Sequence, residues 1–404
     1  MPDKERISRV QSALQEEGLD GVVCGLPVYV LLLSGYWPVV GTSLAVATRD
    51  GACALLAPED EEQLARHGNA GEVRTYRPIS LEKIQSVAEA AAQPLRRLLS
   101  DMGLSCGRVG YELGSASEPA SYSAMHLFGG SLVELLRAAA PSMALAPADD
   151  LLARLAAVKT PAEVERIRTS CQIAAEAFGA GRARLRPGLQ ETAAAEMFRA
   201  PLRVVGTLRR GVQRADGFAW CMAGKNSAEA RFAYARSRST QIGPGEFVLV
   251  HCNSHADGYW TDVTRTYVLG EPEPRHLRLY DAVFAARAAA LAAIRTGVRA
   301  SEVDRAARLI LESRGLGQTF THPAGHGVGL ASISANALPR IHPKSDDVLE
   351  TGMVFNLEPA LYFENWGGVR HCDVVVVTAS GADVLTPFQP RTDDLLLAQE
   401  RQAA

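Results

Sequence analysis

The stretch VLVHCNSHADGYWTDVTRTYVLG, from Val248 to Gly270, determines how the second half of this chain is interpreted. Two apolar, strand-like runs flank a polar segment, Asn253–Gly258, which we expect to be the loop of a β-hairpin. If the two runs fold back on each other in this way, His251 lies opposite Asp262. A histidine and an aspartate would then face each other inside a buried hairpin.

Directly opposed residues of an antiparallel strand pair have their Cβ atoms about 5 Å apart on the same face of the sheet. The side chains of His251 and Asp262 would therefore reach each other, or one shared ion. On the hairpin alone, a hydrogen-bonded pair in the core is the favoured interpretation. A metal site needs further ligands from elsewhere in the chain.

A glycine-rich run, THPAGHGVGL (Thr321–Leu330), contains the histidines His322 and His326. Its three glycines argue against a regular helix, and they allow close backbone approach and unusual dihedral angles. Glycines packed around a histidine indicate a functional loop more often than a structural one. His322 either lines a pocket or lies in a surface turn before proline.

Two further segments combine an apolar strand with polar residues at one end. GMVFNLEP (Gly352–Pro359) ends its strand with Glu358, and GGVRHCDVVVV (Gly367–Val377) carries Arg370 and Cys372 just before its apolar run. A glutamate at the end of a buried strand is costly unless it is paired or binds a metal. These residues extend the candidate site.

Composition restricts the class of protein. The chain has 404 residues, 47% of them hydrophobic, and a net charge of -3, which predicts two globular domains and no polyanionic partner such as nucleic acid. The seven cysteines form no CxxC pair, which fits a reducing compartment. The amino-terminal segment lacks a signal-peptide core, and we find no stretch suited to span a membrane. We therefore expect a cytoplasmic protein.

Strands and helices alternate in the first part of the chain, so we predict an α/β domain over residues 1–148 and an α+β domain with mostly antiparallel strands over 149–404. The strand-like segments of the first domain are GVVCGLPVYVLLL, SLAVATR, ACALLAP and GRVGYEL. In the second domain, predicted helices begin at Thr160 and cover 190–200, 276–296 and 301–314. Predicted strands there cover 246–252, 259–269, 353–358 and 369–377.

The motifs GYWTDVTRTYVLG, GHGVGL, LETGMVFNLEPALY and GGVRHCDVVVVT follow one another in a characteristic order and spacing. With the amino-terminal RISRVQSALQEEGLDGVV they resemble the pita-bread family of creatinase, prolidase, Xaa-Pro aminopeptidase and methionine aminopeptidase. The resemblance covers nearly the whole chain. It implies a creatinase/prolidase-like amino-terminal domain, a pita-bread catalytic domain (the creatinase/aminopeptidase fold) and a homodimer.

Peptidases of this family hold two divalent metals with two Asp, one His and two Glu. The resemblance places Asp262 on the second Asp, His326 on the histidine and Glu358 on the first Glu. At the two remaining positions this chain departs from the family, because His251 replaces the first Asp and Cys372 replaces the last Glu.

The family's catalytic histidines are also replaced. In GKNSAEAR, Arg231 takes the place of the first, and near SANALP the position of the second falls on Asn336. The candidate catalytic residues are therefore Arg231 and His322, and together with Arg370 they are the candidates for binding the substrate. An arginine clamps a carboxylate through paired hydrogen bonds.

Loss of two acidic ligands argues against a two-metal centre, because two cations about 3.5–4 Å apart need bridging carboxylates. We expect one divalent transition metal, Fe, Zn, Mn or Cu, held by His251, Asp262, His326, Glu358 and Cys372. Histidine and cysteine are softer ligands than the carboxylates they replace. A metal-free pocket, as in creatinase, and a vestigial site are the alternatives.

The predicted function is hydrolysis of a carbon–nitrogen bond in a small amide, dipeptide or guanidino-like substrate by a divergent, metallopeptidase-like enzyme. Ordinary Xaa-Pro peptidase activity should be weak or absent, because the family histidines are missing. A mononuclear Fe or Cu enzyme with oxidative or lyase chemistry is the first alternative. A metal-free creatinase-like hydrolase or a non-catalytic binding protein is the second.

Overall fold

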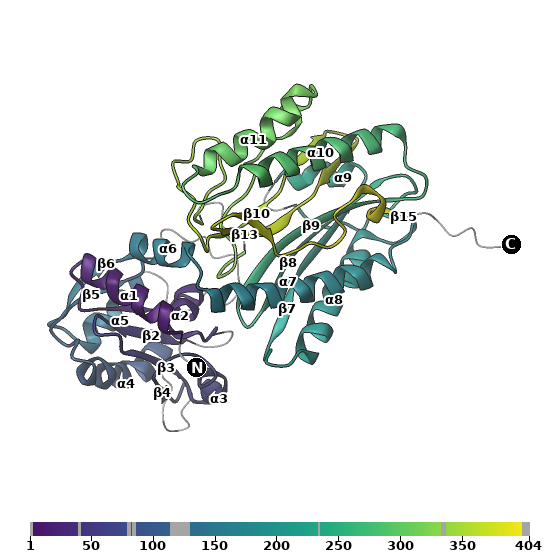
Figure 1. Cartoon of the computed structure of the whole chain (residues 1–404). Helices are drawn as coiled ribbons and strands as arrows, with labels where there is room; N and C mark the ends of the chain where they lie inside the picture. Colours follow the sequence, from purple (N-terminus) through teal and green to yellow (C-terminus); the bar gives the residue numbers. More distant parts are fainter. Residues whose placement is uncertain are drawn as a thin grey trace. The chain divides into compact units, whose positions relative to one another are not determined.

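The computed structural model describes residues 3–38, 42–78, 82, 86–113, 130–232, 235–332 and 337–397 (Figure 1). The chain divides into two compact units, Met1–Ala162 and Glu163–Ala404.

The first unit is built on a mixed six-stranded sheet in the order β4-β3-β2-β1-β5-β6. The pairs β1–β5, β5–β6 and β3–β4 are parallel, and β1–β2 and β2–β3 are antiparallel. Its strands are β1 Gly21–Cys24, β2 Leu44–Thr48, β3 Cys53–Pro58, β4 Glu72–Tyr76, β5 Arg108–Tyr111 and β6 Ala144–Pro147. Its helices are α1 Lys4–Glu16, α2 Pro27–Ser34, α3 Glu62–Ala65, α4 Val87–Asp101, α5 Gly130–Ala139 and α6 Asp149–Ala157, with a short 3₁₀ turn, η1 Glu59–Glu61. The predicted α/β class is confirmed.

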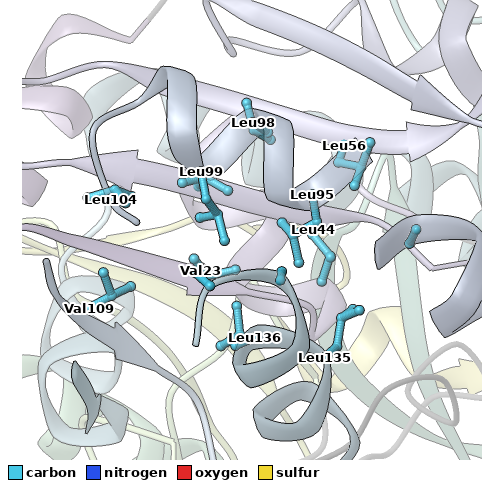
Figure 2. Packing of buried hydrophobic residues seen from close by; sticks show 14 of the residues in the cluster. Val23, Leu44, Leu56, Leu95, Leu98, Leu99, Leu104, Val109, Leu135 and Leu136 are labelled. Atoms are coloured by element: carbon cyan, nitrogen blue, oxygen red, sulfur yellow. The ribbon is translucent and has the colours of Figure 1, made fainter. Parts of the chain in front are cut away.

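The core of this unit forms where α4 and α5 pack on the sheet. A capping box between Ser86 and Glu89 starts α4. Figure 2 shows Leu95, Leu98 and Leu99 of this helix among other buried apolar side chains from the sheet and from α5. This core is complete within the first unit.

Part of the strand predicted from GVVCGLPVYVLLL is wrong. Only β1 is a strand, and the following residues form α2, which has Pro27 in its first turn. The helix ends at Gly35, which adopts a left-handed conformation and donates its N–H to the carbonyl of Leu31. Because most residues of α2 are buried, the sequence shows no helical periodicity there.

The compact units divide after α6, whereas the sequence-based boundary at 148/149 precedes this helix. The reason lies in Arg6 of α1. Its guanidinium donates to the carbonyl oxygens of Leu155 (2.7 Å) and Val158 (3.0 Å), which ties the end of α6 to the first unit.

The second unit contains a four-stranded sheet, β15-β9-β8-β7, a three-stranded sheet, β10-β13-β14, and the hairpin β11-β12. Its strands are β7 Ala215–Ala223, β8 Phe247–Ala256, β9 Tyr259–Leu269, β10 Val354–Leu357, β11 Ala360–Phe363, β12 Gly367–Arg370, β13 Asp373–Thr378, β14 Gly381–Val384 and β15 Leu396–Leu397. Its helices are α7 Pro161–Arg182, α8 Glu191–Leu208, α9 Lys225–Ala228, α10 Pro274–Ala293 and α11 Ala300–Ser313, with 3₁₀ turns η3 Glu229–Arg231, η4 Gly317–Thr319 and η5 Thr392–Asp394.

Among these strands only β15 and β9 pair in parallel, so the prediction of an α+β unit with mostly antiparallel strands is confirmed. Helices lie on both sides of the strands, with α7 and α8 on one side and α10 and α11 on the other (Figure 1). This sandwich buries the hairpin β8–β9 almost entirely.

The sequence predicted a loop over the whole polar segment 253–258, but most of this segment belongs to strand β8. Strand β8 continues to Ala256, and only Asp257 and Gly258 form the turn, both with positive φ (50° and 84°). Two such residues define the tight hairpin turn that matches strand twist. The Asp257 carboxylate accepts the backbone N–H of Arg214 (2.8 Å), which fixes the turn.

The predicted pairing of the hairpin is also wrong by two residues. His251 lies opposite Thr264, and Asp262 lies opposite Asn253. A shift of two residues keeps every side chain on its face, because side chains alternate with a period of two. His251 and Asp262 therefore remain on one face as diagonal neighbours.

A buried ion-pair network lies behind this hairpin. The Asp373 carboxylate accepts from Arg265 (2.7 Å) and Arg287 (2.6 Å), and the side chains of Asp373 and Arg265 are fully buried. Although burial alone would raise it, the neighbouring positive charges hold the pKa of Asp373 well below its usual value. The carboxylate is therefore charged in the folded protein.

The substitution Asp373→Asn should lower the free energy of unfolding by about 3–5 kcal/mol, because it leaves the buried Arg265 guanidinium without its counter-charge. Urea unfolding followed by circular dichroism measures this loss. The matched control is Asp346→Asn, whose ion pair with Arg299 is exposed, and it should change stability by less than about 1 kcal/mol. Equal effects of the two substitutions would contradict the prediction.

Candidate metal centre

The candidate site forms where the hairpin meets the connection between β12 and β13. Thr264 and Cys372 make an antiparallel bridge, with N···O distances of 3.3 and 3.1 Å. This bridge brings the Cys372 thiol to 3.2 Å from the backbone oxygen of Asp262 and 3.5 Å from its carboxylate Oδ1. Two segments far apart in sequence thus present their ligand atoms to one point.

The glycine-rich loop brings in His326. Asn356 of β10 donates its backbone N–H to the carbonyl of His326 (3.0 Å), and its side-chain Oδ1 accepts the N–H of His326 (2.7 Å). A Cβ atom at Gly325 would lie 1.9 Å from the carbonyl oxygen of Asn356, and one at Gly327 would lie 2.1 Å from that of Leu338. Glycine is therefore required at both positions, as the sequence indicated.

Ligand atoms of Asp262, Glu358 and Cys372 all lie within 4.8 Å of one another, and all three come from the buried interior of the unit. Two histidine nitrogens are close to the same carboxylate. His251 Nδ1 is 3.7 Å from Asp262 Oδ1, and His326 Nε2 is 3.7 Å from Asp262 Oδ2. Donors that share one ion at bond lengths of about 2.0–2.3 Å are roughly 3–4 Å apart.

Hydrogen bonds orient the lone pair of His326 toward the cluster. Its Nδ1 lies 3.1 Å from the carbonyl oxygen of Gly327, which can only accept, so Nδ1 carries the proton. Nε2 is then the unprotonated nitrogen, and the Asn356 side-chain amide lies 3.3 Å from it. The Nδ1–H bond to a backbone carbonyl is a regular feature of histidine metal ligands, whereas an ion at Nε2 would replace the contact with the Asn356 amide.

Thr264 has the corresponding effect on His251. The Arg370 Nε donates to the Thr264 hydroxyl oxygen (3.0 Å), which leaves the hydroxyl hydrogen for His251 Nδ1 (3.0 Å). Burial, and then the charge of Arg370, lower the pKa of His251 well below its usual value. His251 is thus neutral, and its Nδ1 accepts from Thr264 at 3.7 Å from Asp262 Oδ1, so an ion bound at Nδ1 would replace this hydrogen bond. Its ring stacks on Trp220 at 5.5 Å.

The charges of the cluster do not balance. Burial and then the negative charge of Glu358 raise the pKa of Asp262 to about 6. Burial and the charge of Asp262 also raise the pKa of Cys372 well above its ordinary value, so the thiol is neutral. Arg370 supplies one positive charge, 3.5 Å from Glu358 Oε2. A cation among these donors would relieve both the repulsion and the burial cost.

These residues fit one divalent transition metal. The structure brings two carboxylates and one thiol together, with a nitrogen of His251 and one of His326 each 3.7 Å from an oxygen of Asp262, and binding of an ion would release the thiol proton. Two cations would need more bridging charge than Asp262 and Glu358 provide. Soft and hard donors together fit Fe, Zn, Mn or Cu, as expected from the sequence.

His322 also lies beside this cluster. Its Nδ1 is 2.7 Å from the carbonyl oxygen of Pro323, and its Nε2 is 3.0 Å from the hydroxyl of Tyr362. The ring is half-buried, and burial lowers its pKa. A neutral His322 therefore accepts from the Tyr362 hydroxyl.

Arg231 lies at the edge of the site. Its guanidinium is over the ring of Phe232 and 3.8 Å from the Glu229 carboxylate. The preceding carbonyl, that of Ala230, accepts a hydrogen bond from Arg370 (3.4 Å), which connects this segment to the cluster. Asn336, the other position of interest, lies outside the described residues.

Sequence reasoning missed the polar residues that orient the ligands. Thr264, Asn356 and Tyr362 each hydrogen-bond to a candidate site histidine. Thr264 and Asn356 each lie two residues from a candidate ligand in the same extended segment, so they share its face. This spacing of two residues is the sequence feature from which Thr264 and Asn356 could have been predicted as neighbours of the site.

The fold and the cluster of candidate ligands together define the class of protein. It is a pita-bread protein whose catalytic domain contains residues suited to bind a metal. Residues 165–379 match metallopeptidase family M24, and residues 6–157 match the creatinase/prolidase amino-terminal domain. The chain therefore belongs to metallopeptidase family M24. The predicted class of enzyme, a hydrolase of carbon–nitrogen bonds, is confirmed at the level of this family.

Individual relatives agree with this assignment. The Xaa-Pro dipeptidase of Pyrococcus furiosus is 27% identical over 384 residues, which cover 95% of this chain and 98% of the relative. The Xaa-Pro dipeptidase of Lactobacillus delbrueckii subsp. lactis is 34% identical over 246 residues, 61% of this chain and 63% of the relative. The solved prolidase from Pyrococcus furiosus is 26% identical, covers 93% of this chain and 98% of its own, and has a TM-score of 0.71.

Within the described ranges, no helix combines the length and apolar character needed to cross a membrane. The predicted cytoplasmic location and the homodimer stay predictions.

The chain should bind one divalent transition metal per protomer when purified without chelators, and Asp262→Asn should lower this content at least 10-fold. The reason is that Asp262 is the carboxylate nearest both histidines and is itself part of the acidic cluster. Elemental analysis after dialysis measures the ratio.

The matched control for that measurement is Asp257→Asn in the turn of the same hairpin, where asparagine is equally suited to the backbone. It should bind metal like the unsubstituted chain. Two equivalents of metal per protomer, or full binding by Asp262→Asn, would contradict the single-ion site.

Proposed function

We propose that this chain hydrolyses a carbon–nitrogen bond in a small, dipeptide-like substrate at a centre with one divalent transition metal. The observation that supports this most directly is the convergence of the acidic cluster and two histidine nitrogens on the Asp262 carboxylate. Membership of the metallopeptidase family supports the class of reaction. When bound, such an ion polarises a carbonyl group and lowers the pKa of water.

The chain's own residues then have distinct tasks in the proposal. His251, Asp262, His326, Glu358 and Cys372 hold the ion. Arg370 lies against Glu358 and Thr264, where it offsets negative charge and offers a donor to a polar group of the substrate.

Proton transfer is proposed to fall to His322. Its Nδ1 donates to the backbone carbonyl of Pro323, and its Nε2 accepts a hydrogen bond from the Tyr362 hydroxyl. The pair can take a proton from one side of the reaction and return it on the other, because a neutral imidazole accepts at Nε2 while Tyr362 donates.

Arg231 is proposed to bind a substrate carboxylate. Its guanidinium is about one quarter exposed (28%), and its weak contact with Glu229 at 3.8 Å leaves it able to turn toward a ligand. A planar guanidinium pairs with a carboxylate through two parallel hydrogen bonds. The family uses histidine at this position, so a free carboxylate close to the scissile bond is the distinguishing feature we expect of the substrate.

One observation supports the alternative chemistry. His251 Nδ1 lies 3.7 Å from one oxygen of the Asp262 carboxylate, and His326 Nε2 lies 3.7 Å from the other. The same three ligand types hold iron in non-haem oxygenases. An oxidative or lyase reaction at a mononuclear Fe or Cu centre is therefore the second candidate function.

The test joins metal analysis to activity. The chain purified without chelators is assayed against non-proline dipeptides, Xaa-Pro dipeptides and small amides, with Mn²⁺ and Zn²⁺ added separately. We expect metal-dependent hydrolysis of a small substrate, with Xaa-Pro dipeptides cleaved weakly because the family histidines are replaced. Bound iron or copper and no hydrolysis would favour the oxidative alternative, and rapid Xaa-Pro cleavage would contradict the role given to those histidines.

The substitution His322→Gln should lower kcat about 100-fold or more while KM changes little, because glutamine hydrogen-bonds but does not transfer protons. Steady-state kinetics on the best substrate of the panel separates the two constants. His342→Gln, at an exposed position, is the matched control and should leave both unchanged. A change confined to KM would show that His322 binds the substrate without moving a proton.

A further inference from the structure

A buried amide on the face of the metal cluster has no role in the site described so far. Asn253 of β8 is completely buried (0% exposed). Within the part of the chain that the structure describes, neither its Oδ1 nor its Nδ2 makes a hydrogen bond. A buried amide without partners is costly, and native proteins rarely keep one without a bound group to satisfy it.

The pairing of the hairpin determines where this amide lies. Asn253 is directly opposite Asp262 and two residues from His251, so all three side chains share one face of the sheet. His251 and Asn253 are near enough for the amide to favour the protonated form of the ring, but the contact does not reach hydrogen-bond geometry. The amide thus lies between the candidate ligands of two strands.

Neighbouring polar side chains on the hairpin do have partners. Thr264 bonds to His251 and Arg370, and on the opposite face Ser254 bonds to Thr261 (2.7 Å). Asn253, beside Asp262, has no such partner for either of its side-chain polar atoms within the described residues. What it adjoins is a cluster of donors with excess negative charge.

We infer that Asn253 is a further ligand of the proposed metal ion, to which it gives its amide oxygen. The inference rests on the proposed single-metal centre. An amide oxygen is a neutral, hard donor, so it adds coordination without adding negative charge to an already acidic cluster. With the Oδ1 on the ion, the Nδ2 hydrogens are left for the Asp262 carboxylate across the strand pair.

If Asn253 is a metal ligand, its replacement should affect metal affinity and the stability of the metal-free protein differently. Replacing an unpaired amide by an apolar group of similar size removes a polar burial cost, so the metal-free protein should not lose stability. The same replacement removes a ligand, so affinity for the ion should fall. A purely structural asparagine would show no loss of metal affinity.

The test uses the full chain, stripped of metal and titrated separately with Mn²⁺, Zn²⁺ and Co²⁺, with bound metal measured by equilibrium dialysis and elemental analysis. We expect Asn253→Leu and Asn253→Ala to weaken binding about 10- to 100-fold, the range typical for loss of a supporting group at a metal site. Asn253→Asp keeps the oxygen and should bind at least as tightly as the unsubstituted chain. With Co²⁺, the absorption spectrum of the leucine and alanine variants should differ from that of the unsubstituted chain.

The matched control is Ser254→Ala, one residue away and on the opposite face, which should bind each ion unchanged. Thermal unfolding of the metal-free variants shows whether they fold, and alanine serves if leucine does not fit. Unchanged affinity in a folded Asn253→Leu or Asn253→Ala overturns the inference, as does an unsubstituted chain that binds none of the three ions. Tight binding that depends on Asn253 in a chain without hydrolytic activity supports the inference and refutes the proposed function instead.

Discussion

The second unit depends on a buried, charged carboxylate whose negative charge is compensated by neighbouring arginines. Asp373 starts strand β13 between Arg265 of β9 and Arg287 of α10, with no exposure of its own side chain. Arg265 also donates to the carbonyl oxygens of Thr264 and Cys372, the two residues that bridge the hairpin to β13. Because charged groups in the interior must find partners, this network fixes the relative position of strands that no local sequence preference would bring together. The network therefore also determines where the candidate metal ligands on these strands lie.

In the neighbouring candidate metal cluster, the same physical rule gives a different result. Burial and then the negative charge of Glu358 raise the pKa of Asp262 to about 6, although Arg370 adjoins Glu358 and lowers that pKa in part. Asp373 keeps its charge because two arginines surround it, whereas Asp262 does not have such compensation. The contrast separates a structural carboxylate from one that is prepared for a cation. It also explains why neutral donors, His251 and Cys372, complete the cluster.

The sequence predicted the fold class of both units and the set of segments that converge, because motif order and strand-end polar residues report on topology. It did not predict the register of the hairpin. Asn253 and Ser254 are polar, which is typical of a loop, but tertiary burial between β7 and β9 keeps them in a strand. The same limit applies to α2, where complete burial removes the periodicity that would reveal a helix. Partners such as Thr264 and Asn356 become recognisable only once the register is known.

Replacement of two acidic ligands by histidine and cysteine changes more than the number of charges. Both substitutes are neutral in the absence of metal, His251 through burial and Arg370, and Cys372 through burial and Asp262. The cluster therefore tolerates deep burial without a second cation, and it gains its full ligand charge only when an ion displaces the thiol proton. Such a centre favours softer ions than an all-carboxylate site does. Arg370 acts in the same direction, since a fixed guanidinium against Glu358 opposes a second cation at that carboxylate.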